Sequence, residues 1–128
     1  MSVRVELTVE GKTYPVRRYY AIISRENDEK GRPTSDPFWQ LFLVMDGLND
    51  DTVTNWMLDP KKLVDGNLTL YKISDGSKFK DIEFKKSTCT LLTDHFNVDN
   101  AFITSFVTIT GKDLKINEAE LLQSWPGH

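Results

Sequence analysis

Residues 2–12 read SVRVELTVEGK, and this stretch sets the pattern that most of the chain follows. Aliphatic and polar residues alternate over 2–9, which is the period-two pattern of a strand with one buried face. Gly11 follows, and glycine permits the positive φ that a tight hairpin needs. The sequence therefore predicts a first strand that turns back into a second strand over 14–24.

The composition favours a β-rich domain. Val, Ile and Thr together number 28, against three Ala, and branched side chains suit a pleated sheet better than a helix. Leu, Ile, Val and Phe account for 36 of the 128 residues, which is enough apolar material for one core. We expect residues 1–128 to form a single domain.

The second half of the chain contains further strand patterns separated by turn signals. They cover 67–73, 79–85, 88–96 and 102–110, and a last short strand is expected at 114–117. Seven or so short strands at this spacing are typical of a sandwich or a barrel. The predicted fold is mainly β, a small antiparallel β-barrel or sandwich with one short flanking α-helix.

That helix is predicted over 51–58, before the Asp59-Pro60 pair that ends it. Asp50 or Asp51 can cap its first turn. It is too short to be stable alone, so its apolar face should dock on the sheet. This face consists of Val53, Trp56 and Met57.

Residues 38–45 hold one polar residue in eight. A strand without alternation is typically covered on both faces. In a small β-domain the second cover must be a helix or another protein chain, and we expect one of these against this strand.

Residues 25–37 break the strand pattern with charges and two prolines. The first eight of these positions carry three cations and three anions, which cannot form an apolar face. A loop this long in a compact domain is usually functional or disordered. Its charges are Arg25, Glu26, Asp28, Glu29, Lys30 and Arg32.

The residues that could carry chemistry form no catalytic constellation. His95 follows Asp94 in a predicted strand, where neighbours point to opposite faces, so a surface histidine is favoured over a catalytic one. Cys89 lies between threonines with no base nearby, and we expect it to be a small buried hydrophobe. Two acidic clusters, at 46–51 and 94–100, lack the spacing of a calcium loop and read as a helix cap and a turn. We expect no catalytic residues, no metal site and no cofactor.

Charge and hydropathy exclude several classes of partner. A net charge of −3 gives nucleic acid no electrostatic reason to bind. No apolar run approaches the roughly 20 residues of a membrane-spanning helix. The N-terminus shows no apolar segment of a secretory signal peptide, and the single cysteine precludes an internal disulfide. We expect a soluble protein made in a reducing compartment.

Several short motifs follow one another along the chain. They are L-T-V-x-G-K-x-Y at 7–14, K-G-R-P-x-S at 30–35, W-M at 56–57, G-x-L-x-L-Y-K at 66–72, I-E-F at 82–84 and a terminal W-P at 125–126. Each motif is weak alone, but in their order and spacing over nearly the whole chain they resemble the Bacteroidetes-type Hcp (TssD) tube proteins of the type VI secretion system.

The resemblance implies a structural subunit and not an enzyme. In the family, six copies of a β-barrel form a ring, and rings stack into the inner tube that a contractile sheath drives into a target cell. Implied partners are further copies of the chain, the sheath, the spike protein and effectors, which ride in the lumen. Such a subunit is cytoplasmic and is then secreted by the type VI system without a signal peptide.

The resemblance also gives the charged loop a role, because the corresponding loop in the family reaches a neighbouring subunit. The predicted interface residues are therefore Arg25, Glu26, Asp28, Glu29, Lys30 and Arg32. A solvated loop whose charges only keep it soluble is the alternative. Opposite charges across a boundary would set register and suppress wrong partners.

Two other functions remain open from the residues alone. One is a small ligand-carrying β-barrel with an aromatic cavity. A small hydrolase is the other, disfavoured by the missing constellation. The cavity of the carrier would be lined by Trp39, Phe42, Phe84, Phe102 and Phe106.

Overall fold

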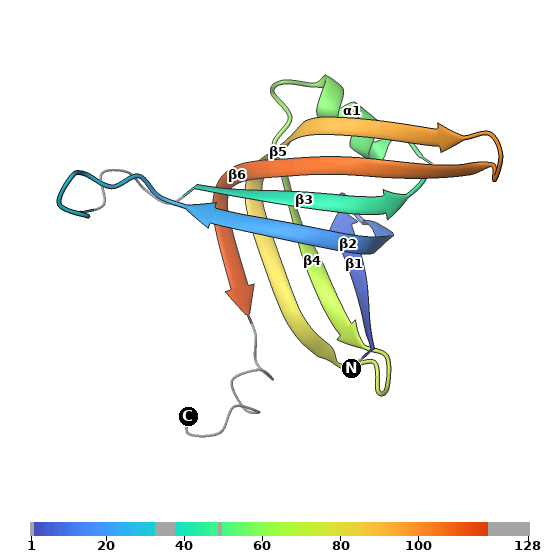
Figure 1. Cartoon of the computed structure of the whole chain (residues 1–128), viewed down its shortest axis with the longest axis horizontal. Helices are drawn as coiled ribbons and strands as arrows, with labels where there is room; N and C mark the ends of the chain where they lie inside the picture. Colours follow the sequence, from blue (N-terminus) through green and yellow to red (C-terminus); the bar gives the residue numbers. More distant parts are fainter. Residues whose placement is uncertain (1, 33–37, 49, 118–128) are drawn as a thin grey trace.

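The computed structural model describes residues 2–32, 38–48 and 50–117. Six strands pair antiparallel in the order β1-β2-β3-β6-β5-β4, and β4 pairs back with β1 to close a barrel (Figure 1). The predicted fold class is confirmed. The elements are β1 (Val3–Val9), β2 (Lys12–Ser24), β3 (Phe38–Asp46), α1 (Thr52–Leu58), β4 (Val64–Lys72), β5 (Lys78–Asn97) and β6 (Phe102–Asn117).

The opening hairpin has the predicted register. Leu7 on β1 lies opposite Tyr14 on β2 and opposite Leu68 on β4, and all three side chains are buried. Because side chains alternate along a strand, this register directs the apolar half of β1 into the barrel.

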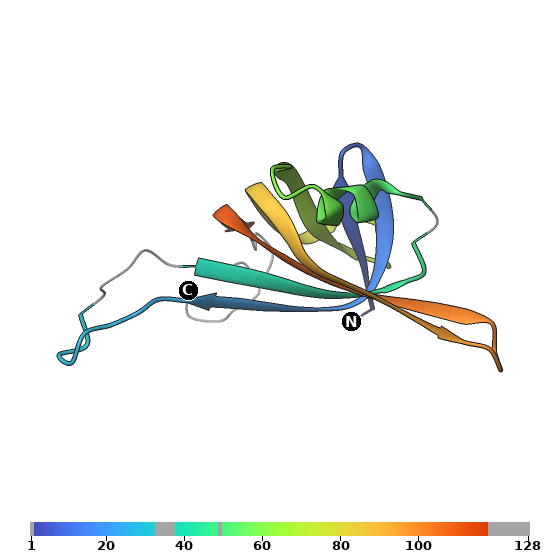
Figure 2. The ribbon, with the colours of Figure 1, turned by 90° about the horizontal axis from the view of Figure 1, so that it is seen from above.

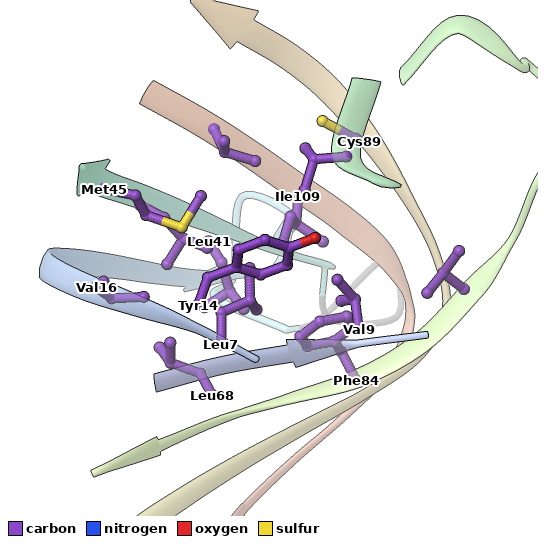
Figure 3. Close-up of a cluster of buried hydrophobic side chains, with 14 of the residues drawn as sticks. Leu7, Val9, Tyr14, Val16, Leu41, Met45, Leu68, Phe84, Cys89 and Ile109 are labelled. Carbon is purple, nitrogen blue, oxygen red and sulfur yellow. The ribbon is translucent and has the colours of Figure 1, made fainter. Parts of the chain in front are cut away.

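The barrel interior is one continuous cluster of buried apolar side chains, part of which is drawn in Figure 3. Every strand contributes side chains to this cluster, so the detachment of any one strand would expose the core to water. Members with almost no exposure include Leu7, Leu41, Leu43, Met45, Leu68, Ile82, Phe84, Val107 and Ile109.

Helix α1 forms where it was predicted and closes one side of this core. Trp56 stacks on Phe84 with ring centroids 6.4 Å apart, and its indole Nε1 donates to the Ser87 carbonyl at 3.1 Å. The Asp50 carboxylate, not that of Asp51, caps the helix by accepting the Thr52 N–H at 3.0 Å. As predicted, the helix is held by docking.

The number of strands differs from the prediction, because two expected breaks are bends. The segments predicted at 79–85 and 88–96 are one strand, β5, and those at 102–110 and 114–117 are one strand, β6. Ser87 lies opposite Gly111, and a Cβ on Gly111 would lie 2.4 Å from the Ser87 Oγ. Since the two irregular positions face each other, both strands bend together and pairing continues.

The bend in β5 is marked by a positive φ of 51° at Lys86. Its backbone N–H donates to the Asp65 carboxylate at 2.9 Å, which ties the bend to β4. Beyond the bend, the β5–β6 hairpin extends away from the barrel, opposite to the loop that follows β2 (Figure 2).

Some predictions fall outside the described residues, namely those for 33–37, Asn49 and the terminal W-P motif. In the described ranges, the structure contains no helix of the length and apolar character that crossing a membrane requires.

Candidate subunit interface

The charged loop after β2 is organised around the carboxylate of Asp28. One oxygen, Oδ1, accepts the backbone N–H groups of Lys30 at 2.9 Å and Arg32 at 2.8 Å. The other, Oδ2, accepts the Arg32 Nε at 2.9 Å. The backbone hydrogen bond from Arg32 is the main reason that the pKa of Asp28 is lowered. The loop therefore carries a defined turn.

The structure brings the six predicted interface residues together on this projecting segment (Figure 1). Asp28 is half-buried and the other five are exposed. Asp28 and Arg32 form an ion pair within the loop, so in the single chain these two charges serve the turn. Contact with a neighbouring subunit stays a prediction for all six.

The strand predicted to be covered on both faces is covered on one by the described residues of a single chain, and a cover from another chain stays a prediction. Along β3, Leu41 and Leu43 are buried in the core, whereas Phe42 and Val44 alternate with them and are half-buried on the outer face. Helix α1 does not supply the second cover, because its buried side chains join the core cluster inside the barrel. The apolar run in the sequence therefore combines a buried apolar face of β3 with an outer face that is also apolar.

The outer face of β3 belongs to a four-stranded platform. Residues 17–24, 38–46, 102–110 and 88–97 form it, in the spatial order β2-β3-β6-β5. One row across it places Tyr20 beside Phe42, then Thr108, then Leu91. The rings of Tyr20 and Phe42 lie 6.0 Å apart, so large apolar groups occupy a surface that faces solvent in a single chain.

Both outer strands of this platform have a free edge within the described residues. Strand β2 pairs with β1 only as far as Val16, so 17–24 pair with β3 alone. Strand β5 pairs with β4 only as far as Ser87, so 88–97 pair with β6 alone. Unpaired edges of this length attract another strand. Sequence reasoning missed them, because pairing partners depend on the closed topology.

The apolar groups at the β5 edge are unusually exposed. Leu91 is 51% exposed, Phe96 55% and Val98, at the hairpin tip, 80%. Phe102 is also exposed, and the Arg17 guanidinium lies over its ring, 5.4 Å from the centroid. A surface of this character is typical of a protein–protein contact.

The histidine, the cysteine and the acidic residues considered for catalysis or metal binding lie at surface, core, capping or turn positions. His95 is exposed on β5. Cys89 is buried as predicted, and burial raises the pKa of its thiol. Asp50 caps α1 and Asp94 accepts the Ser105 hydroxyl at 2.7 Å. Within the described ranges, no three His, Cys, Asp or Glu side chains gather as a metal site would require.

The aromatic cavity of the carrier hypothesis does not form. Trp39 and Phe84 lie in the core with ring centroids 6.1 Å apart. Phe42, Phe102 and Phe106 are half-buried or exposed. The register places Phe42 and Phe106 on the platform, because they alternate with buried neighbours. The five aromatics therefore line no common pocket.

The family model described as hemolysin coregulated protein Hcp (TssD) matches residues 1–126. The fold is similar to that of Hcp1 from Flavobacterium johnsoniae, with a TM-score of 0.76 and 19% identity over 91% of this chain and 96% of that one. It is also similar to Hcp1 from Salmonella typhimurium, with a TM-score of 0.69 and 12% identity over 92% and 87%.

A chain from the structure of an extracellular contractile injection system shares the fold as well. The match is to a PVC sheath–tube complex in the extended state, with a TM-score of 0.66 and 14% identity over 91% of this chain and 89% of that one. Among curated proteins, no sequence matches the chain.

Proposed function

The chain belongs to the Hcp (TssD) family, and from that membership we propose that it forms six-membered rings that stack into the inner tube of a type VI secretion system. It is a structural tube subunit. The observation that carries this conclusion is the family match over residues 1–126, because it spans the barrel, the platform and the charged loop together.

The two free edges support a head-to-tail ring. They lie on opposite sides of one platform, so β2 of one copy can pair with β5 of the next. Such a contact joins two different surfaces, and repeating it generates a closed ring if the rotation closes. Each copy would then cover the free edge of its neighbour. Tyr20 on β2 of one copy would lie near Leu91 on β5 of the next.

The charged loop is the second element of the proposed contact. Arg25, Glu26, Glu29 and Lys30 extend from the turn that Asp28 and Arg32 hold together. A preformed turn reduces the ordering cost of binding. The mixed charges would set the register between copies more than they add affinity.

The remaining partners follow from the tube. A fold neighbour is part of a sheath–tube complex, which supports a contractile sheath around stacked rings of this chain. We extend the proposal to effectors in the lumen, to a spike protein at the tip, and to a cytoplasmic subunit that is secreted with the tube. The subunit would act by assembly and catalyse no reaction.

Mass in solution tests the proposal. Six copies of a 14.7 kDa chain would give a particle of about 88 kDa in light scattering coupled to size exclusion. Electron microscopy of the same fraction should show closed rings. A particle of one or two chains at micromolar concentration and moderate salt would contradict the ring.

A further inference from the structure

A pocket with a volume of about 320 Å³ lies on the outer face of the platform. Its lining comes from three strands, with Arg17 and Arg18 on β2, Val44 on β3, and Thr104 and Phe106 on β6. The register explains this grouping, because Val44 lies opposite Arg18 on one side and opposite Phe106 on the other. Two cationic side chains therefore share one pocket with an aromatic ring and an aliphatic side chain.

The two arginines of the pocket differ in their contacts. The Arg17 Nε lies 3.7 Å from the Asp46 carboxylate, and the Arg17 guanidinium lies over the ring of Phe102. The exposed Arg18 guanidinium makes no hydrogen bond or ion pair with another described residue. A guanidinium presents its N–H donors in a planar fork that matches a carboxylate. Arg18 is therefore available to an anion, whereas Arg17 already has one.

The polar lining of the pocket also includes the hydroxyl of Thr104. This side chain is half-buried, and its hydroxyl has no hydrogen-bond partner among the described residues. Asp46 lies opposite Thr104 and is the carboxylate that approaches Arg17. Two arginines and this one carboxylate leave the pocket and its border with a net charge of +1. The charge and the two available donors suit a carboxylate.

We propose that this pocket binds an acidic segment of a partner protein. The carboxylate of the segment accepts hydrogen bonds from the Arg18 guanidinium and the Thr104 hydroxyl, and an apolar side chain next to it packs on Phe106. Charge complementarity carries the choice of an anion, because hydrogen bonds between ionised groups are about twice as strong as those between neutral groups. The site is independent of ring formation and goes beyond it.

The surroundings of the pocket favour a protein segment over a small carboxylic acid. Phe42 shares the outer face of β3 with Val44, and the rings of Phe42 and Tyr20 lie 6.0 Å apart. A segment that leaves the pocket can place a second apolar side chain on these rings, whereas a small acid leaves them in water. Apolar surface bordered by polar groups in this way is typical of protein–protein contacts.

Blocked peptides test the chemistry of the site in the full chain. The first probe is a dipeptide of glutamate and phenylalanine with both ends blocked, and its matched control carries glutamine in place of glutamate. Titration followed by nuclear magnetic resonance should show that the glutamine peptide binds at least about tenfold more weakly, because it lacks the charge. Equal affinity for the two peptides, or binding of neither, overturns the proposal.

A charge-matched pair of variants tests the role of Arg18. Arg18→Gln should weaken binding of the acidic dipeptide at least about tenfold. Arg4→Gln removes the same charge from an exposed position on β1, outside the platform, and should leave the affinity unchanged. Circular dichroism checks that both variants fold. Equal losses in the two variants would mean that only the net charge attracts the peptide, and this result overturns the proposal.

A longer peptide tests whether the site takes an extended segment. A second phenylalanine placed two positions after the first should tighten binding about fivefold through burial of apolar surface, and Phe42→Ala should remove this gain. If the added ring brings no gain, the site takes small acids and the proposal is overturned.

Light scattering of the same samples reports the ring separately, so failure of the site and failure of the ring are distinguishable. A loss of particle mass in Arg18→Gln, with no peptide bound by the unmodified chain, would mean that an acidic group of a neighbouring copy fills the pocket. That result also overturns the proposal.

Discussion

The closed side of the barrel and the open platform share strands, but their apolar side chains and strand edges are covered in different ways. On the closed side, Trp56 and Phe84 stack, and the bend at Gly111 packs directly on Ser87. On the platform, 17–24 and 88–97 keep free edges, and Leu91 and Phe96 face solvent. The closed side is complete in one chain, whereas the platform would be covered by another copy in the proposed ring. Substitutions should therefore divide into those that unfold the chain and those that only separate chains.

The largest effect is expected for Trp56→Ala. The substitution removes a fully buried ring, its stacking on Phe84 and its hydrogen bond to the Ser87 carbonyl. Loss of a buried tryptophan costs about 3–5 kcal/mol in the free energy of unfolding. Urea unfolding followed by circular dichroism measures it. Leu58→Ala on the exposed end of the same helix is the control and should cost far less.

The next effect is expected for Gly111→Ala. The new Cβ would lie 2.4 Å from the Ser87 Oγ and 2.7 Å from the Ser87 Cα, so the two bent strands must move apart. Overpacking of this kind costs about 1–3 kcal/mol. Thermal unfolding measures the loss, and Lys112→Ala, at the exposed next position, is the control. An unchanged melting temperature would contradict the close approach at the bend.

The helix and the bend at Gly111 also show which features the sequence predicts and which it does not. Alternation in 2–9, the turn at Gly11 and the apolar face of the helix are local signals, and all three appear in the structure. The polar residues near Lys86 and the glycine at 111 also look local, and they predict strand ends. Because Ser87 and Gly111 face each other across the long β5–β6 hairpin, the result is a bend that both strands share.

The candidate interface shows the same limit. The charges of the loop are visible in the sequence, but the turn that Asp28 builds with Arg32 is not. The apolar run at 38–45 predicts a strand covered on both faces, and within the described part of one chain only one face of β3 is buried. Which residues lack a pairing partner depends on the order in which the barrel closes, and no pattern in 17–24 or 88–97 reveals it.

On the platform, Leu91→Lys should weaken the assembly and leave the fold intact. Leu91 is half exposed at the free edge of β5, and a lysine there opposes strand addition. We expect the interface to lose about 2 kcal/mol, the size of an interface hot spot. Light scattering at falling protein concentration reports the separation, and circular dichroism reports the fold. Ile73→Lys, at another site that is more than half exposed, on the turn after β4, should leave assembly unchanged.

A smaller effect is expected for reversing charge in the loop. Glu26→Lys with Glu29→Lys changes the described loop from neutral to a net charge of +4 and leaves the turn at Asp28 in place. Exposed ion pairs contribute about 0–1 kcal/mol each, so the ring should weaken at low protein concentration and not vanish. Added salt should reduce the difference from the unmodified chain. Identical assembly of both proteins at low salt would remove this loop from the interface.

The smallest effect concerns the turn within the loop, and it should leave the barrel untouched. The pKa of Asp28 lies below its ordinary value of 3.8, chiefly because the carboxylate accepts the backbone N–H of Arg32. A group with a depressed pKa stabilises the folded turn above its ordinary pKa and ceases to do so as the pH falls through the lower, folded value. The turn should therefore persist at pH 5 and open only below pH 3.8.

Nuclear magnetic resonance can follow this opening through the amide shifts of Lys30 and Arg32, whose N–H groups donate to Asp28. Both amides should titrate together, while the amide of Leu43 in the core stays constant over the same range. Asp28→Asn removes the charge at every pH and should abolish the titration. If the two loop amides still titrate in that variant, another acid controls the turn, and the ordered loop must be attributed to a different contact.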